Sequence, residues 1–176
     1  IERLCDGIPS HEEVTHWLNP KRSGLYALDG TWMKLNGEDF VLLILLDVTT
    51  LDVVSWSVAE EETEESYARL LSQAETEIRG SAKGFFCDGD PGLLKALRSR
   101  FPETPIQLCV FHKYARAGQI IPFTRTRTEM DREIKRRVES VLFASTKEEA
   151  IRNLSDLQRY AREHHDYGKL RKIVGM

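Results

Sequence analysis

The sequence predicts an α/β fold, a mixed five-stranded sheet with flanking helices, followed by an all-helical segment. Two observations predict it. Apolar runs of strand length occur five times between residues 25 and 110, the first three separated only by turns and the last two reached through helix-length segments. Beyond residue 112 the apolar residues recur only at helical spacing. We therefore expect a three-stranded antiparallel meander and then two parallel strands with right-handed crossovers.

The meander is predicted from its first turn. Residues 25–35 and 40–47 are apolar runs, and the dipeptide Asn36-Gly37 between them is typical of a two-residue β-hairpin. A further turn leads to a third strand over residues 53–58. Three strands joined by short turns pair in an antiparallel order.

The second half of the sheet alternates with helices. A helix should begin at Thr63, which can cap it, and end at Gly80. A short buried strand over residues 83–87 follows, and then a helix that begins at Pro91, since proline suits the first helical position. A fifth strand over residues 106–110 completes the sheet.

The C-terminal part is predicted to be helical. Apolar residues between Met130 and Leu142 recur at helical spacing, and Thr146 with Glu149 has the spacing of a capping box that opens another helix. The expected regions are a linker or the end of a preceding element over residues 1–22, a core over residues 23–118 and a helical segment over residues 119–176.

The composition is that of an ordinary soluble globular protein, with 41% hydrophobic and 30% charged residues. No apolar run reaches the length that crosses a bilayer, and the first residues have no signal-peptide pattern. Three cysteines, Cys5, Cys87 and Cys109, are too few and odd in number for a disulfide framework. We expect an intracellular protein, in the cytoplasm or nucleoid of a prokaryote or the nucleus of a eukaryote.

The charge is divided along the chain. Residues 1–112 contain 10 Lys and Arg against 19 Asp and Glu, a net charge of −9, and residues 113–176 contain 15 against 9, a net charge of +6. Two interpretations remain open: solvated helix faces, or a cation-binding part beside a part that binds a polyanion.

Asp29 and Asp88 each lie where an apolar run ends, in Leu-Tyr-Ala-Leu-Asp-Gly-Thr and Gly-Phe-Phe-Cys-Asp-Gly-Asp. A carboxylate at the end of a buried strand is costly unless it is paired, hydrogen-bonded or bound to a cation. Hard cations such as Mg²⁺ prefer oxygen ligands, and such sites catalyse phosphoryl transfer. The alternative is structural, with Asp29 in a turn and Asp88 in a helix-capping loop.

The segment around Asp88 resembles a known family. The string Phe-Cys-Asp-Gly-Asp-Pro-Gly-Leu-Leu-Lys-Ala-Leu-Arg-Ser-Arg-Phe-Pro, followed by Ile-Gln-Leu-Cys-Val-Phe-His-Lys, resembles the core of Mutator-like transposases and their insertion-sequence relatives. The resemblance covers residues 26 to about 118. It implies a ribonuclease-H-like fold and a site of three acids, Asp, Asp and Glu. Asp29 matches the first acid, Asp88 the second, and Cys109 with His112 the family's Cys-x-x-His signature.

The resemblance implies a DDE-type transposase core. Asp29 and Asp88 would hold Mg²⁺ or Mn²⁺ for cleavage and strand transfer of duplex DNA, in an enzyme that acts as a homo-oligomer, a dimer. Residues 1–22 would be a linker or the end of a preceding N-terminal DNA-binding region, and residues 119–176 would be the insertion that precedes the third acid. That acid is expected after Met176, so the chain alone should be weakly active or inactive. Glu62 is a second candidate, although it lies in an acidic run at a helix N-terminus.

Two other functions remain open. A truncated or domesticated relative would keep the fold and bind DNA or a protein without cutting. A metal-dependent nuclease of the same fold would hydrolyse strands without joining them. A third acid against the sheet would favour the enzyme.

The Cys109 and His112 pair has a zinc-like spacing, but Cys5, His11 and His16 are too scattered to complete a zinc site. A conformational or DNA-contacting role, or a buried cysteine beside a capping histidine, is the alternative. Basic residues near the start of the helical segment could neutralise DNA phosphates, or form a charged face interleaved with acids. They are Arg125, Arg127, Arg132, Lys135, Arg136 and Arg137.

Overall fold

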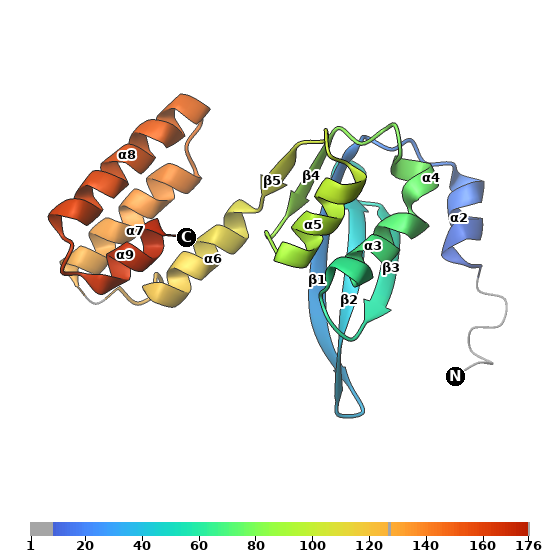
Figure 1. Cartoon of the computed structure of the whole chain (residues 1–176), viewed down its shortest axis with the longest axis horizontal. Helices are drawn as coiled ribbons and strands as arrows, with labels where there is room; N and C mark the ends of the chain where they lie inside the picture. The colour runs from blue at the N-terminus through green and yellow to red at the C-terminus, as the bar shows by residue number, and fades with distance from the viewer. Residues whose placement is uncertain (1–8, 127, 176) are drawn as a thin grey trace. The chain divides into compact units, whose positions relative to one another are not determined.

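The computed structural model describes residues 9–126 and 128–175 (Figure 1). The chain divides into two compact units. The sheet unit comprises Ile1–Phe85 and Pro91–Ile106, and the helical unit comprises Phe86–Asp90 and Gln107–Met176. The predicted boundaries at residues 22 and 118 stay a prediction. Within the described ranges no helix is long and apolar enough to cross a membrane.

The mixed five-stranded sheet is confirmed. Its strand order is β3-β2-β1-β4-β5, and β1 pairs antiparallel with β2 and β2 with β3. Phe85 N–H donates to the carbonyl of Pro105, and Cys109 N–H donates to that of Cys87. These two hydrogen bonds show that β4 and β5 pair in parallel. The strands are β1 (Leu25–Leu35), β2 (Glu38–Asp47), β3 (Val53–Ala59), β4 (Gly84–Cys87) and β5 (Ile106–Leu108).

The first hairpin is as predicted. Asn36 and Gly37 have φ values of 53° and 91°, which is the left-handed pair that a type I′ turn requires. This turn fixes the register, in which Leu35 pairs with Glu38 and Asp29 with Ile44. The second strand begins at Glu38, two residues earlier than predicted, because strand pairing continues to the residues that flank the turn.

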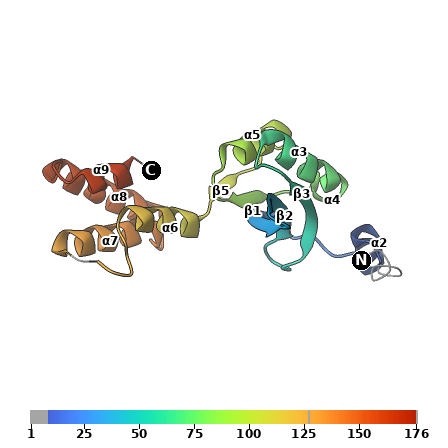
Figure 2. The same ribbon diagram turned by 90° about the horizontal axis from the view of Figure 1, so that it is seen from below.

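Helices α3 (Glu64–Gln73), α4 (Glu75–Ile78) and α5 (Pro91–Arg100) lie on the same side of the sheet (Figure 2). Thr63 caps α3 as predicted, and its Oγ1 accepts from Ser66 N–H. The single helix predicted up to Gly80 is instead interrupted at Ala74. This side of the sheet holds the core of the unit, in which Tyr26, Leu28, Val41, Leu43 and Leu45 of the strands and Leu70, Leu71, Leu93 and Leu97 of the helices are buried.

The opposite face of the sheet is apolar and solvent-exposed. Side chains alternate along a strand, so Asp29 points away from the face that carries Leu28. Asp29 pairs with Ile44, and Ile44 pairs with Trp56, whose side chain is 52% exposed. Asp29 therefore lies on the side of the sheet that α3, α4 and α5 do not cover.

The helical unit packs its helices around an apolar centre. They are α6 (Val110–Ile120), α7 (Glu129–Leu142), α8 (Lys147–Glu163) and α9 (Gly168–Val174). The buried centre comprises Ala117, Ile121, Phe123, Ile134, Val138, Leu157, Leu170 and Ile173. Two predicted helices correspond to α7 and α8, whereas α6 and α9 were not predicted. The fifth strand was predicted to continue to Val110 but ends at Leu108, because Val110 already opens α6.

A short helix, α2 (His11–Leu18), lies inside the segment predicted to be a linker. Its capping box is complete: Ser10 Oγ accepts from Glu13 N–H, and Glu13 Oε2 accepts from Ser10 N–H at 2.7 Å.

Candidate catalytic site

Asp29 is an exposed carboxylate in the middle of β1. Its Oδ1 accepts a hydrogen bond of 3.0 Å from the N–H of Gly30, the next residue. In the described part of the chain it has no other hydrogen bond or ion pair, so Oδ2 is available. A carboxylate that makes so few hydrogen bonds within the protein can bind a cation or another ligand.

Glu62 lies against Gly30, the neighbour of Asp29. Its Oε1 accepts from the Tyr67 hydroxyl at 3.0 Å, and its Oε2 accepts from the Trp32 indole at 3.3 Å. A Cβ at Gly30 would lie 1.8 Å from Glu62 Oε1, so the strand needs glycine here for the carboxylate to approach. Gly30 belongs to the helix-covered face and Asp29 to the other. The role of Glu62 as third acid stays a prediction.

Asp88 follows β4 directly and is half-buried. Its Oδ1 accepts from Asp90 N–H at 2.9 Å, closing a local turn. Gly89 between them has a φ of 93°, which other residues rarely adopt, and a Cβ there would approach the side chain of Leu108 to 3.3 Å. The Asp-Gly-Asp sequence thus presents Asp88 at the end of the strand and leaves Oδ2 without a hydrogen bond to any described residue.

Helix α6 begins beside this turn. Cys109 is its N-cap, and the Cys109 N–H donates to the carbonyl of Cys87 at 2.6 Å. This bond places the start of α6 next to Asp88, because Cys87 and Asp88 are consecutive. The family signature therefore has a structural account in which Cys109 anchors the helix through its backbone, while its thiol is free.

A cavity of about 230 Å³ lies between Asp88 and α6. His112, Arg116 and Gln119 line it from one helical face, at positions i, i+4 and i+7. None of the three makes a hydrogen bond or ion pair with another described residue. Sequence reasoning missed Arg116 and Gln119 because α6 was not predicted. Their helical spacing from His112 was the signal that could have found them.

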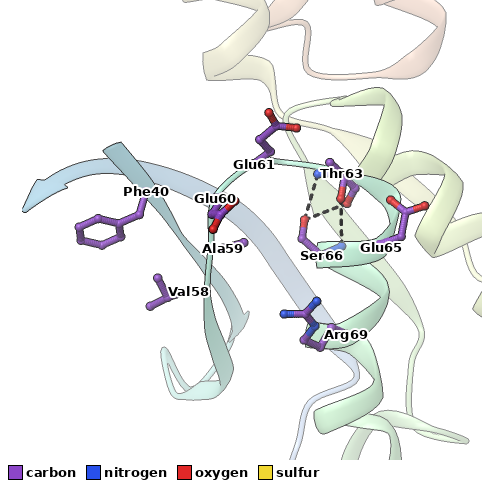
Figure 3. A pocket seen from close by; sticks show the side chains of 9 residues that line it. All are labelled: Phe40, Val58, Ala59, Glu60, Glu61, Thr63, Glu65, Ser66 and Arg69. Carbon is purple, nitrogen blue, oxygen red and sulfur yellow. Dashed lines mark hydrogen bonds between the residues drawn. The ribbon is translucent and has the colours of Figure 1, made fainter. Parts of the chain in front are cut away.

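A larger cavity of about 480 Å³ lies in the sheet unit, between β3 and the start of α3 (Figure 3). Glu60, Glu61 and Glu65 surround it, with Arg69 as the cation among its lining residues. Its acidic mouth would repel a nucleic acid backbone. Its hydroxyl groups, as Figure 3 shows, bond within the cap of α3. This cavity therefore does not suit a phosphodiester, and a catalytic role of Asp88 stays a prediction.

Two buried carboxylates serve the fold. Asp47, fully buried, accepts from Ser23 N–H and Oγ–H and from the N–H groups of Thr49 and Thr50, at 2.7 to 3.1 Å. Burial alone would raise the pKa of Asp47, but these hydrogen bonds outweigh it and the pKa is lowered. The hydrogen bond of 2.6 Å from Tyr167 likewise lowers the pKa of buried Asp131.

A divalent cation fits the donor types at Asp29 and Asp88. Each offers a carboxylate oxygen with no hydrogen bond to a described residue, which is the ligand that Mg²⁺ and Mn²⁺ favour. Among the described residues no three His, Cys, Asp or Glu side chains form a metal-binding group. Cys5, one residue weighed for a zinc site, lies outside the described residues.

The cations of α7 are paired within their own helix. Arg132 pairs with Glu129, and Arg136 and Arg137 both pair with Glu133. Lys135 Nζ lies 3.7 Å from a carboxylate oxygen of Glu139, and the Arg137 guanidinium stacks 4.2 Å from the centre of the Tyr160 ring. Arg125 is exposed before the helix, and Arg127 lies outside the described residues. DNA contact by these residues stays a prediction.

A family model decides the identity. The model of the MULE transposase domain matches residues 26–116, slightly more than half of the chain. The chain belongs to the MULE transposase domain family. Its function is that of a transposase catalytic core, and the family implies enzymes of DNA phosphoryl transfer. In this MULE transposase domain the strand order β3-β2-β1-β4-β5 is that of the ribonuclease-H-like fold predicted from the sequence.

Solved structures give weaker likenesses. The HTLV-2 integrase catalytic core domain in complex with magnesium, in its trimeric form, is 15% identical, with a TM-score of 0.42 and coverage of 87% of this chain and 83% of that one. The simian T-cell lymphotropic virus intasome in complex with a PP2A regulatory subunit is 13% identical, with a TM-score of 0.43 and coverage of 68% and 48%. Both TM-scores are too low to support an argument. No curated protein matches the MULE transposase domain described here.

Proposed function

We propose that the chain is the catalytic core of a DDE-type transposase in which Asp29 and Asp88 hold Mg²⁺ or Mn²⁺. The proposed reaction is cleavage of phosphodiester bonds at the ends of a mobile element, followed by transfer of the 3′ ends to target DNA. One observation carries the proposal. Asp88 keeps an uncommitted carboxylate oxygen in a cavity that also contains an imidazole, a guanidinium and an amide without partners among the described residues.

The residues of the cavity suit a phosphodiester. The Arg116 guanidinium can donate two parallel hydrogen bonds to the non-bridging oxygens of a phosphate, and Gln119 can donate a further one from its amide. His112 can donate a hydrogen bond to the same group. These groups would orient the scissile phosphate and neutralise charge that develops on it.

The two aspartates have the complementary task. A divalent cation, when bound, would activate the attacking water or 3′-hydroxyl and stabilise the leaving oxygen. Asp29 needs no rearrangement of the fold to accept such a ligand, since its hydrogen bond comes from its own neighbour. The third acid is proposed to be Glu62 or a glutamate outside the 176 residues.

The proposal includes the partners. The substrate is duplex DNA at element ends and target, and the active form is a homo-oligomer, a dimer. The enzyme would act where the host's DNA lies, in the nucleoid or the nucleus.

A second function, DNA binding without cleavage, is favoured by one observation. Among the described residues, neither Asp29 nor Asp88 belongs to a group of three or more His, Cys, Asp or Glu side chains that could hold a metal ion. A domesticated relative would retain the phosphate-binding residues of α6 and lose the chemistry.

The test is a cleavage and strand-transfer assay with the full-length gene product in Mg²⁺ or Mn²⁺. The variants are Asp88→Ala and, as a matched control, Asp39→Ala, whose exposed carboxylate pairs with exposed Lys34 and with no other described residue. We expect Asp88→Ala to lose cleavage and joining and Asp39→Ala to keep both. Equal activity of wild type and Asp88→Ala would refute the site. Cleavage without joining would identify a nuclease, and DNA binding by a wild type that does not cleave would support the second function.

A further inference from the structure

The helical unit contains a second basic cavity, remote in sequence from Asp88. It has a volume of about 640 Å³ and lies between the end of α8 and α9. Gln158, Ala161 and Arg162 line it at helical spacing, His165 follows in the turn after α8, and Arg171 lines it from α9. We call these five residues and their cavity the α8–α9 groove.

The cations of the groove differ from those of α7. In the helical unit as described, neither Arg162 nor Arg171 has an ion pair or a side-chain hydrogen bond, and His165 has none either. Arg132 and Arg136 of α7 each pair with a glutamate three residues earlier. A guanidinium that is already paired must break its ion pair before it can bind a phosphate. An unpaired guanidinium binds a phosphate without the free-energy cost of breaking an ion pair.

Among the described residues no carboxylate lines the α8–α9 groove. Glu163 and Asp166, which neighbour Arg162 and His165 in the sequence, are exposed and do not line it. No carboxylate within the groove therefore offsets the positive charge of the two guanidinium groups, and the groove attracts an anion. Its remaining wall is formed by Ala161, Val174 and Gly175, small or apolar residues that let a sugar-phosphate chain approach closely.

We propose that the α8–α9 groove binds the phosphate backbone of duplex DNA. Arg162 and Arg171 each bind one phosphate through parallel N–H donors, and Gln158 adds an amide donor. Such contacts position DNA and carry no sequence information. The choice of DNA as the polyanion rests on the proposed function. The groove adds to that function a second place where DNA is bound, distinct from the site of the reacting phosphate.

The test measures binding of the full chain to a labelled duplex of arbitrary sequence by fluorescence anisotropy, across a salt series in EDTA. The groove variant is R162Q/R171Q and the matched control is R79Q/R159Q, which removes the same number of charges from two exposed arginines that pair with Glu75 and Asp156 and do not line the groove. Because each phosphate contact contributes about 0.9 to the slope of log Kd against log salt, the groove variant should lower the slope by about 2. The control should retain nearly the wild-type slope.

A wild-type slope in the groove variant, or equal losses in both variants, would overturn the proposal. Thermal unfolding of the two variants checks the premise: both substitutions in the groove variant remove unpaired exposed side chains, so its Tm should equal that of wild type, and a marked fall would contradict that premise. EDTA removes the divalent cation that Asp88 is proposed to hold, so this assay measures binding apart from cleavage. The binding assay thus tests the groove proposal, and the cleavage assay tests the catalytic-site proposal, so the failure of one can be distinguished from the failure of the other.

Discussion

Four aspartates of this chain fall into two pairs with opposite surroundings. Asp47 is fully buried and accepts four hydrogen bonds, and Asp131 is buried with a hydroxyl donor at 2.6 Å and an ammonium at 3.8 Å. Among the described residues, Asp29 and Asp88 each accept one hydrogen bond, from the backbone N–H of Gly30 and of Asp90, and they are exposed and half-buried respectively. The first pair is committed to the fold. The second pair is free to bind, and the difference separates structural carboxylates from candidate ligands.

The largest effect should follow Asp29→Asn, measured as DNA cleavage by the full-length protein. Loss of a metal ligand removes several kcal/mol of transition-state stabilisation, so cleavage should fall by about 100-fold or more. The free energy of unfolding should change by no more than about 0.5 kcal/mol, because Asp29 is exposed and its hydrogen bond is local. Asp39→Asn, on the next strand, is the control and should keep full activity. A fully active Asp29→Asn would remove Asp29 from the functional pair.

Asp47→Ala should cost the most stability. The substitution leaves the N–H groups of Ser23, Thr49 and Thr50 without their acceptor in a partly buried site, and each donor that is left unsatisfied there is costly. Urea denaturation should show a loss of about 2–4 kcal/mol in the free energy of unfolding. Asp39→Ala should change it by less than about 0.5 kcal/mol. Equal stability of the two variants would mean that Asp47 is not committed to the fold.

Stability should fall at acid pH because of the committed pair. The pKa values of Asp47 and Asp131 are lowered in the folded protein, so both contribute stability above the pKa of an unfolded aspartate, about 3.9. That contribution is lost as the pH falls below about 4 and through the lowered values. Urea midpoints measured against pH should decline over this range, and less steeply in Asp47→Asn. An unchanged slope in the variant would contradict the role of Asp47.

The smallest effect should come from Gly30→Ala. The new Cβ would displace the Glu62 carboxylate from Trp32 and Tyr67, and the loss of these hydrogen bonds should cost about 1 kcal/mol of unfolding free energy. In a Glu62→Ala background the same substitution should hardly change the free energy of unfolding, because the carboxylate that the new Cβ would contact is absent. Equal costs in the two backgrounds would show that Gly30 is needed for another reason.

Much of the sheet could be predicted from the sequence. The Asn36-Gly37 turn fixed the hairpin, and the apolar runs located Asp29 within one strand and Asp88 at the end of another. These features are local, because turn residues and alternation act over a few positions. The family resemblance then predicts that both aspartates belong to the catalytic site, and this assignment stays a prediction.

Helix α6 could not be predicted by the same means. Val110 extends the apolar run of the fifth strand, and a short apolar run does not distinguish strand from helix. The hydrogen bond from Cys109 to Cys87 ends the strand and starts the helix, and it joins residues 22 positions apart. Arg116 was therefore missed as a neighbour of Asp88. The contact of Glu62 with Gly30 is likewise set by packing between distant segments.

The central claim is that Asp88 is free for function while Asp47 is committed to the fold. The most direct measurement compares Asp88→Asn with Asp47→Asn in the full-length protein, with Mg²⁺-dependent DNA cleavage per folded molecule and the free energy of unfolding measured on the same samples. The account predicts that Asp88→Asn loses cleavage at unchanged stability, and that Asp47→Asn loses stability at unchanged cleavage per folded molecule. Wild-type cleavage by Asp88→Asn, or a loss of stability equal to that of Asp47→Asn, would contradict it.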